Sequence, residues 1–412
     1  MLRFLNSRES GVSDPIQFYR AETTRRVFNL GLSENKEFER LFAGNINTLD
    51  VDLIESRYLL AGGAEGFIMI YDVYNNTGNV KYKCNSVGTI ALNSRHRHKF
   101  SVETVLWYPL DTGMFTSSGT DNLLKIWDTN RLKPADQYEF SSVVFNHHMS
   151  PIATKHCLIA VATQSSSVKL VDLKSGSATH SLKGHSKGVF NVKWSPYHEF
   201  VLASAGSDNR IFLWDIRNAK GSMLDFDQYN GRPPKDMINN GLTSHNRPVT
   251  GVQFSSDGLR LVSCGLDNKA HIWCTQTGKN LNLDFSVNSM GTRTSQFAIS
   301  QGSAPDLIFM PNGKSIDAFD LNTGKRQYTL HGHFRQVTCC YYHADFHELY
   351  SGSGDRNILV WEAKTGTSVN YVCKKETKSV KQEPGSELLV TNMEPVTAIQ
   401  ATADSWSSDE ET

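Results

Sequence analysis

Histidine, serine, aspartate and tryptophan recur together in four stretches of the sequence. In each stretch the tryptophan follows the aspartate by six residues, and the aspartate follows the serine by four. A histidine lies upstream of every set. The four sets are His98, Ser117, Asp121 and Trp127; His185, Ser204, Asp208 and Trp214; His245, Ser263, Asp267 and Trp273; and His333, Ser351, Asp355 and Trp361.

The side chains of one set can form a chain of hydrogen bonds. The aspartate can accept from the histidine ring, the histidine can bond the serine, and the serine can accept from the indole N–H. Inside a protein, such a network is satisfied only when all four members are present. We therefore predict a structural role for these sets and no catalytic residues among them. We also place no serine in a nucleophile elbow.

Each set lies in a unit that is predicted to form four short β-strands. In the Trp214 unit, "FNVKWS" and "FVLASAG" are strands, and the turn "SDN" leads into "RIFLWDI". β-branched and aromatic runs bounded by Gly, Asn and Asp are typical of strands and turns. Units of about 40 residues that carry Gly-His and Trp-Asp pairs resemble WD40 repeats. Gly184-His185 and Gly332-His333 are two such Gly-His pairs.

Three further copies of the unit are degenerate. "YLLAGGAEGFIMIYDV", "CLIAVATQSSSVKLVDL" and "DLIFMPNGKSIDAFDL" keep only parts of the pattern. Four complete and three degenerate units predict an all-β, seven-bladed WD40 β-propeller, whose sixth blade has the least support. The run Glu39–Asn45 has the form of the outer strands that precede Gly-His elsewhere. We expect it to pair with the last blade and close the ring, because closure removes open sheet edges.

The two ends lie outside the repeats. Residues 1–36 are predicted to form a helix-loop-helix, in which Asp14 caps the second helix and Pro15 occupies its first turn. Residues 37–372 are assigned to the propeller. Residues 373–412 are acidic and poor in bulky apolar side chains, which predicts a disordered tail. Within the tail, Lys381 lies in a short pattern typical of small-modifier attachment.

Composition excludes several kinds of chemistry. The chain has 412 residues, with 42 Lys and Arg against 42 Asp and Glu, so the basic excess of nucleic-acid-wrapping proteins is missing. No apolar run reaches the roughly 20 residues of a membrane span. No Cys-x-x-Cys pair, second ligand cluster or phosphate loop supports a metal or cofactor. His147 and His148 are expected in a loop.

One arginine distinguishes the fourth unit from the others. Trp214-Asp215-Ile216-Arg217 puts Arg217 in the turn after the third strand, on the ring face opposite the histidine-bearing loops. On spacing alone it is equally well an ordinary exposed arginine. A guanidinium there can present a fixed fork to a partner's carboxylate or carbonyl.

Trp-Asp-x-Arg in a mid-ring blade resembles the motif of the WD40 substrate receptors of cullin-4 ubiquitin ligases. The helix-loop-helix ahead of the ring is similar to that group as well. Longer runs, among them "DPIQFYRAETTRRVFNL", "SVETVLWYPLDTGMFTSSGTD" and "WSSDEE", resemble one such receptor nearly end to end, as expected of an orthologue from another animal. The likeness is weakest at 75–97, 218–245, 278–305 and in the tail before Ser405.

The resemblance implies a non-catalytic receptor subunit in the nucleus that acts in transcription-coupled nucleotide excision repair. Implied partners are the adaptor (the large subunit of damaged-DNA-binding protein), cullin-4 and its RING subunit, the Cockayne syndrome group B protein, the UV-stimulated scaffold protein and RNA polymerase II. Direct contact with DNA is left open. The adaptor contacts are assigned to Phe4, Leu5, Phe18, Arg20, Arg25, Arg26 and Arg217.

Two other functions remain open at this point. One is a general scaffold or a reader of histone or other peptide tails, without a ligase link. The other is a propeller hydrolase, for which the sequence offers no converging set of titratable residues. What copurifies with the protein distinguishes the first from a ligase subunit, and a measurable turnover would identify the second.

Overall fold

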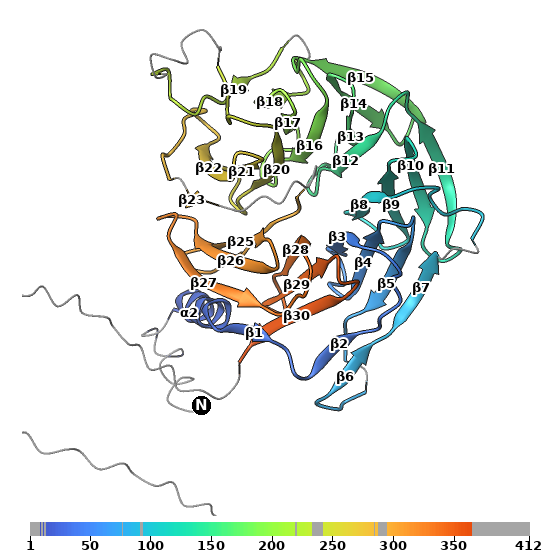
Figure 1. The fold of residues 1–412 in the computed structure, drawn as a ribbon, viewed down its shortest axis with the longest axis vertical. Helices are drawn as coiled ribbons and strands as arrows, with labels where there is room; N and C mark the ends of the chain where they lie inside the picture. The colour runs from blue at the N-terminus through green and yellow to red at the C-terminus, as the bar shows by residue number, and fades with distance from the viewer. Residues whose placement is uncertain are drawn as a thin grey trace, which may run out of the picture. The chain divides into compact units, whose positions relative to one another are not determined.

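Short runs of β-branched and aromatic residues, separated by turns, form seven four-stranded antiparallel sheets arranged in a ring (Figure 1). The predicted seven-bladed β-propeller is therefore confirmed. The computed structural model describes residues 9, 11, 14–75, 77–90, 94–218, 221–232, 242–283, 285–286 and 295–364. Among these residues, no helix has the length and apolar content needed to cross a membrane.

We letter the strands of each blade a to d, from the centre of the ring outward. The first three blades are β3 (Ile46–Val51), β4 (Tyr58–Gly63), β5 (Ile68–Asp72) and β7 (Ser86–Ile90); β8 (Val102–Trp107), β9 (Met114–Gly119), β10 (Leu123–Asp128) and β11 (Lys133–Glu139); and β12 (Val144–Met149), β13 (Leu158–Thr163), β14 (Ser167–Asp172) and β15 (Ser177–Lys183).

The next three blades follow in the same way. They are β16 (Val189–Trp194), β17 (Val201–Gly206), β18 (Ile211–Asp215) and β19 (Leu224–Asp225); β20 (Val249–Phe254), β21 (Arg260–Gly265), β22 (Lys269–Cys274) and β23 (Phe285–Ser286); and β24 (Ala298–Ile299), β25 (Leu307–Asn312), β26 (Ser315–Asp320) and β27 (Arg326–His331). The sixth blade, which had the least support in the sequence, is thus a complete four-stranded sheet.

The seventh blade closes the ring with a strand from the start of the chain. It consists of β28 (Val337–His343), β29 (Glu348–Ser353), β30 (Ile358–Ala363) and, as its outer strand, β1 (Leu30–Leu32). Leu30 pairs with Ala363 and Leu32 with Trp361. The prediction that Glu39–Asn45 forms this strand is therefore wrong. The ring is nevertheless closed, as expected, by a strand that precedes the first blade.

Packing explains why the closing strand lies earlier in the chain. Leu30 is buried in a cluster that contains Trp361, so β1 seals the apolar face of the last blade. The next strand, β2 (Lys36–Phe38), runs parallel to β6 (Tyr82–Cys84) beside the first blade. Phe42, in the segment predicted as the strand, instead packs as an irregular residue in the cluster shared by the first and seventh blades.

Apolar clusters between neighbouring blades form the core. One cluster joins Ala160 and Leu170 of the third blade to Val192, Leu202 and Trp214 of the fourth. Inner strands are buried on both faces because each sheet packs against two neighbours. An outer strand such as β15 is mostly exposed. The blades therefore stabilise one another only as a ring.

Helix α2 (Pro15–Phe28) lies at the outer edge of the ring beside the seventh blade. Its first turn is as predicted: Asp14 is the N-cap and its Oδ1 accepts from the N–H of Ile16, with Pro15 next in the chain. Residues 1–8, which make up most of the first predicted helix, and the predicted tail 373–412 lie outside the described residues. Leu30–Leu32 falls inside the segment 1–36, so the last blade takes one strand from that segment.

Candidate docking face

The ring has two faces, which we name by their loops. The d–a face carries the loops that join one blade to the next and the turns between strands b and c. The a–b face carries the loops between strands a and b and the turns between strands c and d. His98 lies in a d–a loop between β7 and β8, and Asp121 lies in the b–c turn that follows β9.

The four His-Ser-Asp-Trp sets are assembled on the d–a face as hydrogen-bonded tetrads. His98 Nδ1 lies 2.9 Å from Asp121 Oδ1, and its Nε2 lies 2.6 Å from Ser117 Oγ. The indole N–H of Trp127 donates to the same serine oxygen at 2.8 Å. The other three tetrads repeat this geometry, with His–Ser distances of 2.7 or 2.8 Å and indole–Ser distances of 2.8 Å.

Each tetrad also pins a loop. The aspartate accepts a backbone N–H from the residue after the histidine, for example from Lys99 to Asp121 at 3.1 Å. The other donors are Ser186, Asn246 and Phe334. The d–a loop and the b–c turn are thereby held together in four blades.

Electrostatics supports a structural role for the tetrads. Burial lowers the pKa of His98, even though Asp121 favours the charged ring. Burial acts to raise the pKa of Asp121, but the hydrogen bond and charge of His98, together with the backbone N–H groups of Lys99 and Leu123, outweigh it, and the pKa lies below its ordinary value. A neutral imidazole between a carboxylate and a serine has both nitrogens occupied, so no group remains to reach a substrate.

One loop has a spacing that the sequence analysis passed over. Gly184, Ser186 and Gly188 match the Gly-x-Ser-x-Gly pattern of a nucleophile elbow. That motif requires a strand followed by a helix, whereas this loop joins strand β15 to strand β16. The exposed Ser186 is the residue whose backbone N–H donates to Asp208. The spacing is therefore a by-product of the Gly-His pair.

His147 and His148 were expected in a loop, and this prediction is wrong. Both lie in strand β12 of the third blade. His147 is fully buried, with Nε2 2.8 Å from Thr116 Oγ1 and Nδ1 2.8 Å from Ser118 Oγ. Its ring joins the second and third blades. Strand β12 lacks the alternation of apolar and polar residues that is typical of a half-buried strand, because two of its inward-facing residues are polar.

One cluster of possible metal ligands is present in the described part of the chain. His245, Asp267 and His271 offer ligand atoms within 4.8 Å of one another. However, His245 already uses Nδ1 on Asp267 and Nε2 on Ser263. Two of the three members, His245 and Asp267, therefore belong to the fifth-blade tetrad, and their ligand atoms are already engaged there.

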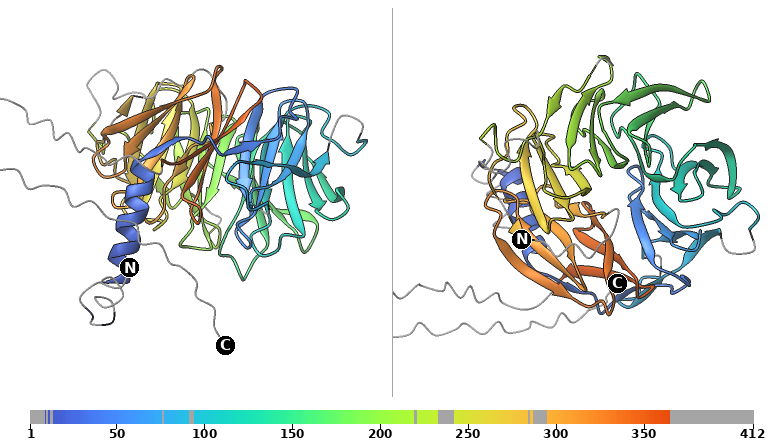
Figure 2. Two further views of the ribbon diagram at one scale, coloured as in Figure 1. Left: turned by 90° about the horizontal axis from the view of Figure 1, so that it is seen from below. Right: turned by 45° about the horizontal axis from the view of Figure 1, so that its top comes forward.

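Helix α2 is attached to the a–b face. Thr24 Oγ1 accepts from the N–H of Ala304, in the a–b loop of the sixth blade, at 2.9 Å. The ring of Tyr19 lies 5.9 Å from that of His347, in the a–b loop of the seventh blade. Figure 2 shows the helix projecting past the ring, with its N-terminal end farthest away. Its buried residues are Thr23 and Val27.

The outer part of α2 leaves large apolar side chains exposed. Ile16, Phe18 and Tyr19 are 62%, 54% and 55% exposed. Arg20 is exposed beside them. Such side chains on a helix anchored at one end can dock in a groove of another protein. Phe4 and Leu5, predicted to act with them, lie outside the described residues.

Arg25 and Arg26 are not isolated charges. Both pair with Glu22 on the same helix, each at 2.8 Å. Hydrogen bonds from Arg25 and Arg26 lower the pKa of Glu22 to about 2. Part of their charge is thus neutralised within the helix, which makes them weaker candidates for partner contact than Arg20.

Arg217 lies on the same face, in the c–d turn of the fourth blade. Its guanidinium stacks 4.9 Å from the centre of the Phe200 ring and pairs with Asp215 at 2.6 Å. The side chain remains 65% exposed. A hollow beside it is lined by Ile152, Tyr197 and Phe200. The guanidinium is thus held in place while its outer edge faces solvent.

An apolar ring of residues on the a–b face was missed by the sequence analysis. Each of the first five blades contributes one or two exposed apolar side chains from its a–b loop. They are Leu53, Ile54, Leu110, Ile152, Tyr197 and Leu259. We call these six residues the apolar ring. The only signal in the sequence was one or two apolar residues in each of five short loops, and nothing local says that these loops share one face.

Comparison with known proteins agrees with this architecture. The family model "WD domain, G-beta repeat" matches residues 176–215, 238–274 and 324–362. WD repeat-containing protein ATCSA-1 of Arabidopsis thaliana is 30% identical over 88% of this chain and 95% of the plant protein. The chain belongs to the WD-repeat proteins. The second-blade tetrad, around Trp127, lies outside the matched ranges although its geometry is complete.

More distant relatives of this WD-repeat protein match about half of it. Radiation-sensitive protein 28 of Saccharomyces cerevisiae is 25% identical over 43% of this chain and 38% of the yeast protein. Histone acetyltransferase type B subunit 2 of Debaryomyces hansenii is 24% identical over 45% of this chain and 46% of its own length. WD-repeat propellers of this kind typically serve as rigid scaffolds or receptors.

The d–a face of this WD-repeat protein also carries exposed aromatic side chains. Phe100 and Phe334 are 63% and 80% exposed, close to the tetrad residues His98 and His333 in the sequence. Because the tetrads pin these loops, the two rings extend from an ordered surface. The protein therefore presents two separate candidate contact surfaces, one on each face.

Proposed function

We propose that this WD-repeat protein is the substrate-receptor subunit of a cullin-4 RING ubiquitin ligase, and an animal orthologue of the Cockayne syndrome group A protein. In this proposal it acts in the nucleus, in transcription-coupled nucleotide excision repair. The letters CSA in the name of the plant relative and the long sequence runs described above support it. Trp214-Asp215-Ile216-Arg217 and the helix ahead of the ring fit the same group of receptors.

The observation that carries the proposal is the convergence of three features on the a–b face. Helix α2 comes from the N-terminal segment, whereas Arg217 and the apolar ring come from five different blades. Exposed apolar surface combined with a positioned arginine is typical of interface hot spots. We assign this face to the adaptor, the large subunit of damaged-DNA-binding protein, which links the receptor to cullin-4 and its RING subunit.

The proposed mechanism involves no bond chemistry in the ring. The receptor holds a target so that one of its lysines lies near a ubiquitin-loaded enzyme on the cullin arm, and the gain is one of proximity. A rigid propeller suits this role because its faces keep a constant relation to each other. The targets and repair partners, namely RNA polymerase II, the Cockayne syndrome group B protein and the UV-stimulated scaffold protein, are assigned to the d–a face.

Matched double substitutions on the two faces test the assignment. Ile16→Asp with Phe18→Asp places charges on the exposed side of α2, away from its buried Thr23 and Val27. We expect this variant to lose the adaptor and cullin-4 on affinity purification from cells while its circular dichroism is unchanged. Phe100→Asp with Phe334→Asp is the control on the d–a face, and it should retain the adaptor. Retention by the helix variant would refute the assignment.

The same purification tests the alternative function. A scaffold or histone-tail reader without a ligase link would copurify chromatin-modifying subunits in place of adaptor and cullin. The similarity to a histone acetyltransferase subunit covers less than half of either chain, so it favours the fold more than this function.

A further inference from the structure

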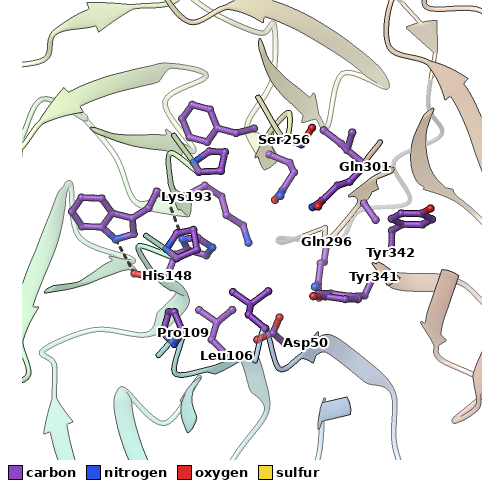
Figure 3. Close-up of a pocket in the computed structure, with 18 of the residues that line it drawn as sticks. Asp50, Leu106, Pro109, His148, Lys193, Ser256, Gln296, Gln301, Tyr341 and Tyr342 are labelled. Carbon is purple, nitrogen blue, oxygen red and sulfur yellow. Dashed lines mark hydrogen bonds between the residues drawn. The ribbon is translucent and has the colours of Figure 1, made fainter. Parts of the chain in front are cut away.

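A cavity of about 390 Å³ opens in the middle of the a–b face (Figure 3). Its walls come from the a strands and a–b loops of the blades, and Leu53 and Ile152 of the apolar ring lie at its mouth. Lys193 and His148 project into it from one side, and Asp50 and Tyr341 line the opposite side. The tetrads and the adaptor assignment use none of these four residues.

Lys193 is the strongest cationic feature of the cavity. It lies in β16, is partly buried, and has no hydrogen-bond or ion-pair partner among the residues that the structure describes. Burial lowers the pKa of the Lys193 ammonium below its ordinary value, against the favourable influence of Asp50. An ammonium group that faces a narrow cavity without a partner is costly. A ligand with a negative charge would remove that cost.

His148 adds a neutral donor next to Lys193. Its Nδ1 accepts the backbone N–H of Trp194 at 3.1 Å. Burial keeps its pKa well below the ordinary value, so the ring is neutral and its remaining proton lies on Nε2. The Nε2–H group is therefore a donor for an acceptor placed beside Lys193.

The carboxyl group of Asp50 repels a bound anion less strongly than a fully ionised aspartate would. Its Oδ2 accepts the backbone N–H of Trp107 at 2.8 Å. Burial raises the pKa of Asp50 above the ordinary range of a carboxyl group, which favours its neutral form. Tyr341 contributes no charge: its hydroxyl faces the carbonyl of Val51 at 3.5 Å. The donor side of the cavity thus dominates.

We propose that this cavity, which we call the channel mouth, binds the carboxylate of an acidic side chain that belongs to the protein docked on the a–b face. Lys193 forms the ion pair and His148 Nε2–H donates a hydrogen bond. We assign the carboxylate to a docked protein because of the apolar ring. A free small anion in the cavity would leave the side chains of the apolar ring exposed to water. The identity of the docked protein that supplies the carboxylate rests on the proposed function. The preference of the cavity for a carboxylate does not depend on that function.

Three small probes of similar size test the chemistry on the full-length chain alone: propionate, propionamide and propylammonium. Titration followed by NMR or calorimetry should detect only propionate, with a dissociation constant on the order of millimolar for so small a ligand. Lys193→Met and Lys193→Gln should each weaken propionate binding by at least about tenfold. Lys169→Met is the control, since that ammonium already bonds Ser181 Oγ. Equal binding of the amide, or preference for the ammonium, would overturn the proposal.

A second comparison tests the source of the carboxylate. An acetylated Ala-Glu-Ala amide should bind the channel mouth more tightly than its Ala-Gln-Ala counterpart, and Lys193→Met should abolish the difference. Binding of propionate without binding of the glutamyl peptide would refute a side-chain ligand. Lys193→Met should also weaken adaptor binding in the purified complex. If the adaptor failed to bind even the unaltered chain, the proposed function would fall while the propionate result would stand.

Discussion

The guanidinium of Arg217 lies 2.6 Å from the carboxylate of Asp215, two residues earlier in the same turn. The same carboxylate accepts the backbone N–H of Arg217 at 3.0 Å. Hydrogen bonds from Arg217 lower the pKa of Asp215. The aspartate of the Trp-Asp pair thus orients the arginine over Phe200 before any partner arrives, which reduces the entropy lost on binding.

Replacing Arg217 should weaken the adaptor complex without breaking it. We expect Arg217→Ala to reduce adaptor affinity by about three- to tenfold, because one exposed ionic contact contributes little by itself. Surface plasmon resonance with purified adaptor measures this. Arg131→Ala is the matched control, since Arg131 also pairs with the aspartate of its Trp-Asp turn, in the second blade. If both variants lost the same affinity for the adaptor, the position of Arg217 in the fourth blade would not be specific to adaptor binding.

Two N-terminal truncations should separate docking from ring closure. Removing residues 1–22 leaves Thr23, Val27 and β1 in place, so the free energy of unfolding should change little while the adaptor is lost. Removing residues 1–36 also deletes β1 and Lys36, whose ammonium pairs with Glu348 at 2.7 Å and is almost fully buried. The unpaired Glu348 alone should cost about 3 kcal/mol. Urea unfolding measures both changes, and similar stability of the two truncations would contradict closure by Leu30–Leu32.

Removing one tetrad hydroxyl should destabilise the fold. Ser204→Ala takes away the partner of both His185 Nε2 and the indole N–H of Trp214. Leaving two buried polar groups unsatisfied should lower the free energy of unfolding by about 2 kcal/mol or more. Ser186→Ala in the adjacent loop keeps its backbone hydrogen bond to Asp208 and should change stability by less than about 0.5 kcal/mol. Equal effects would remove the structural role of the tetrad.

His147 should make stability depend on pH. Burial lowers its pKa from 6.5 to about 3, so below pH 6.5 the unfolded chain takes up a proton that the folded chain refuses. Acid therefore favours the unfolded state through this residue. The destabilisation caused by His147→Gln should be smaller at pH 5 than at pH 7 by about 2 kcal/mol.

The control for this measurement is a substitution that does not titrate. Val144→Ala lies in the same strand, and its cost should be the same at both pH values. Taking the difference between variant and unaltered protein also cancels other titrating groups, such as Asp50. A constant penalty for His147→Gln across this range would show that His147 does not titrate in this way.

Much of the fold could be predicted because its signals are local. The Ser-Asp-Trp spacing lies within two strands and one turn, so the tetrads were readable residue by residue, as was the Asp14 cap. Blade order followed from chain order. The errors came where partners are distant: Leu30–Leu32 and Glu39–Asn45 both had the character of an outer strand, and only packing against Trp361 distinguished them.

The sequence by itself determined the propeller class, the four tetrads and the position of Arg217 in its turn, because the residues that define these features recur at fixed spacings within one repeat unit. Only the tertiary structure decided that the apolar ring, α2 and Arg217 share one face, and that Lys193, His148 and Asp50 meet in one cavity. These groups come from blades far apart in the chain. Their proximity depends on the closure of the ring, which no local spacing encodes.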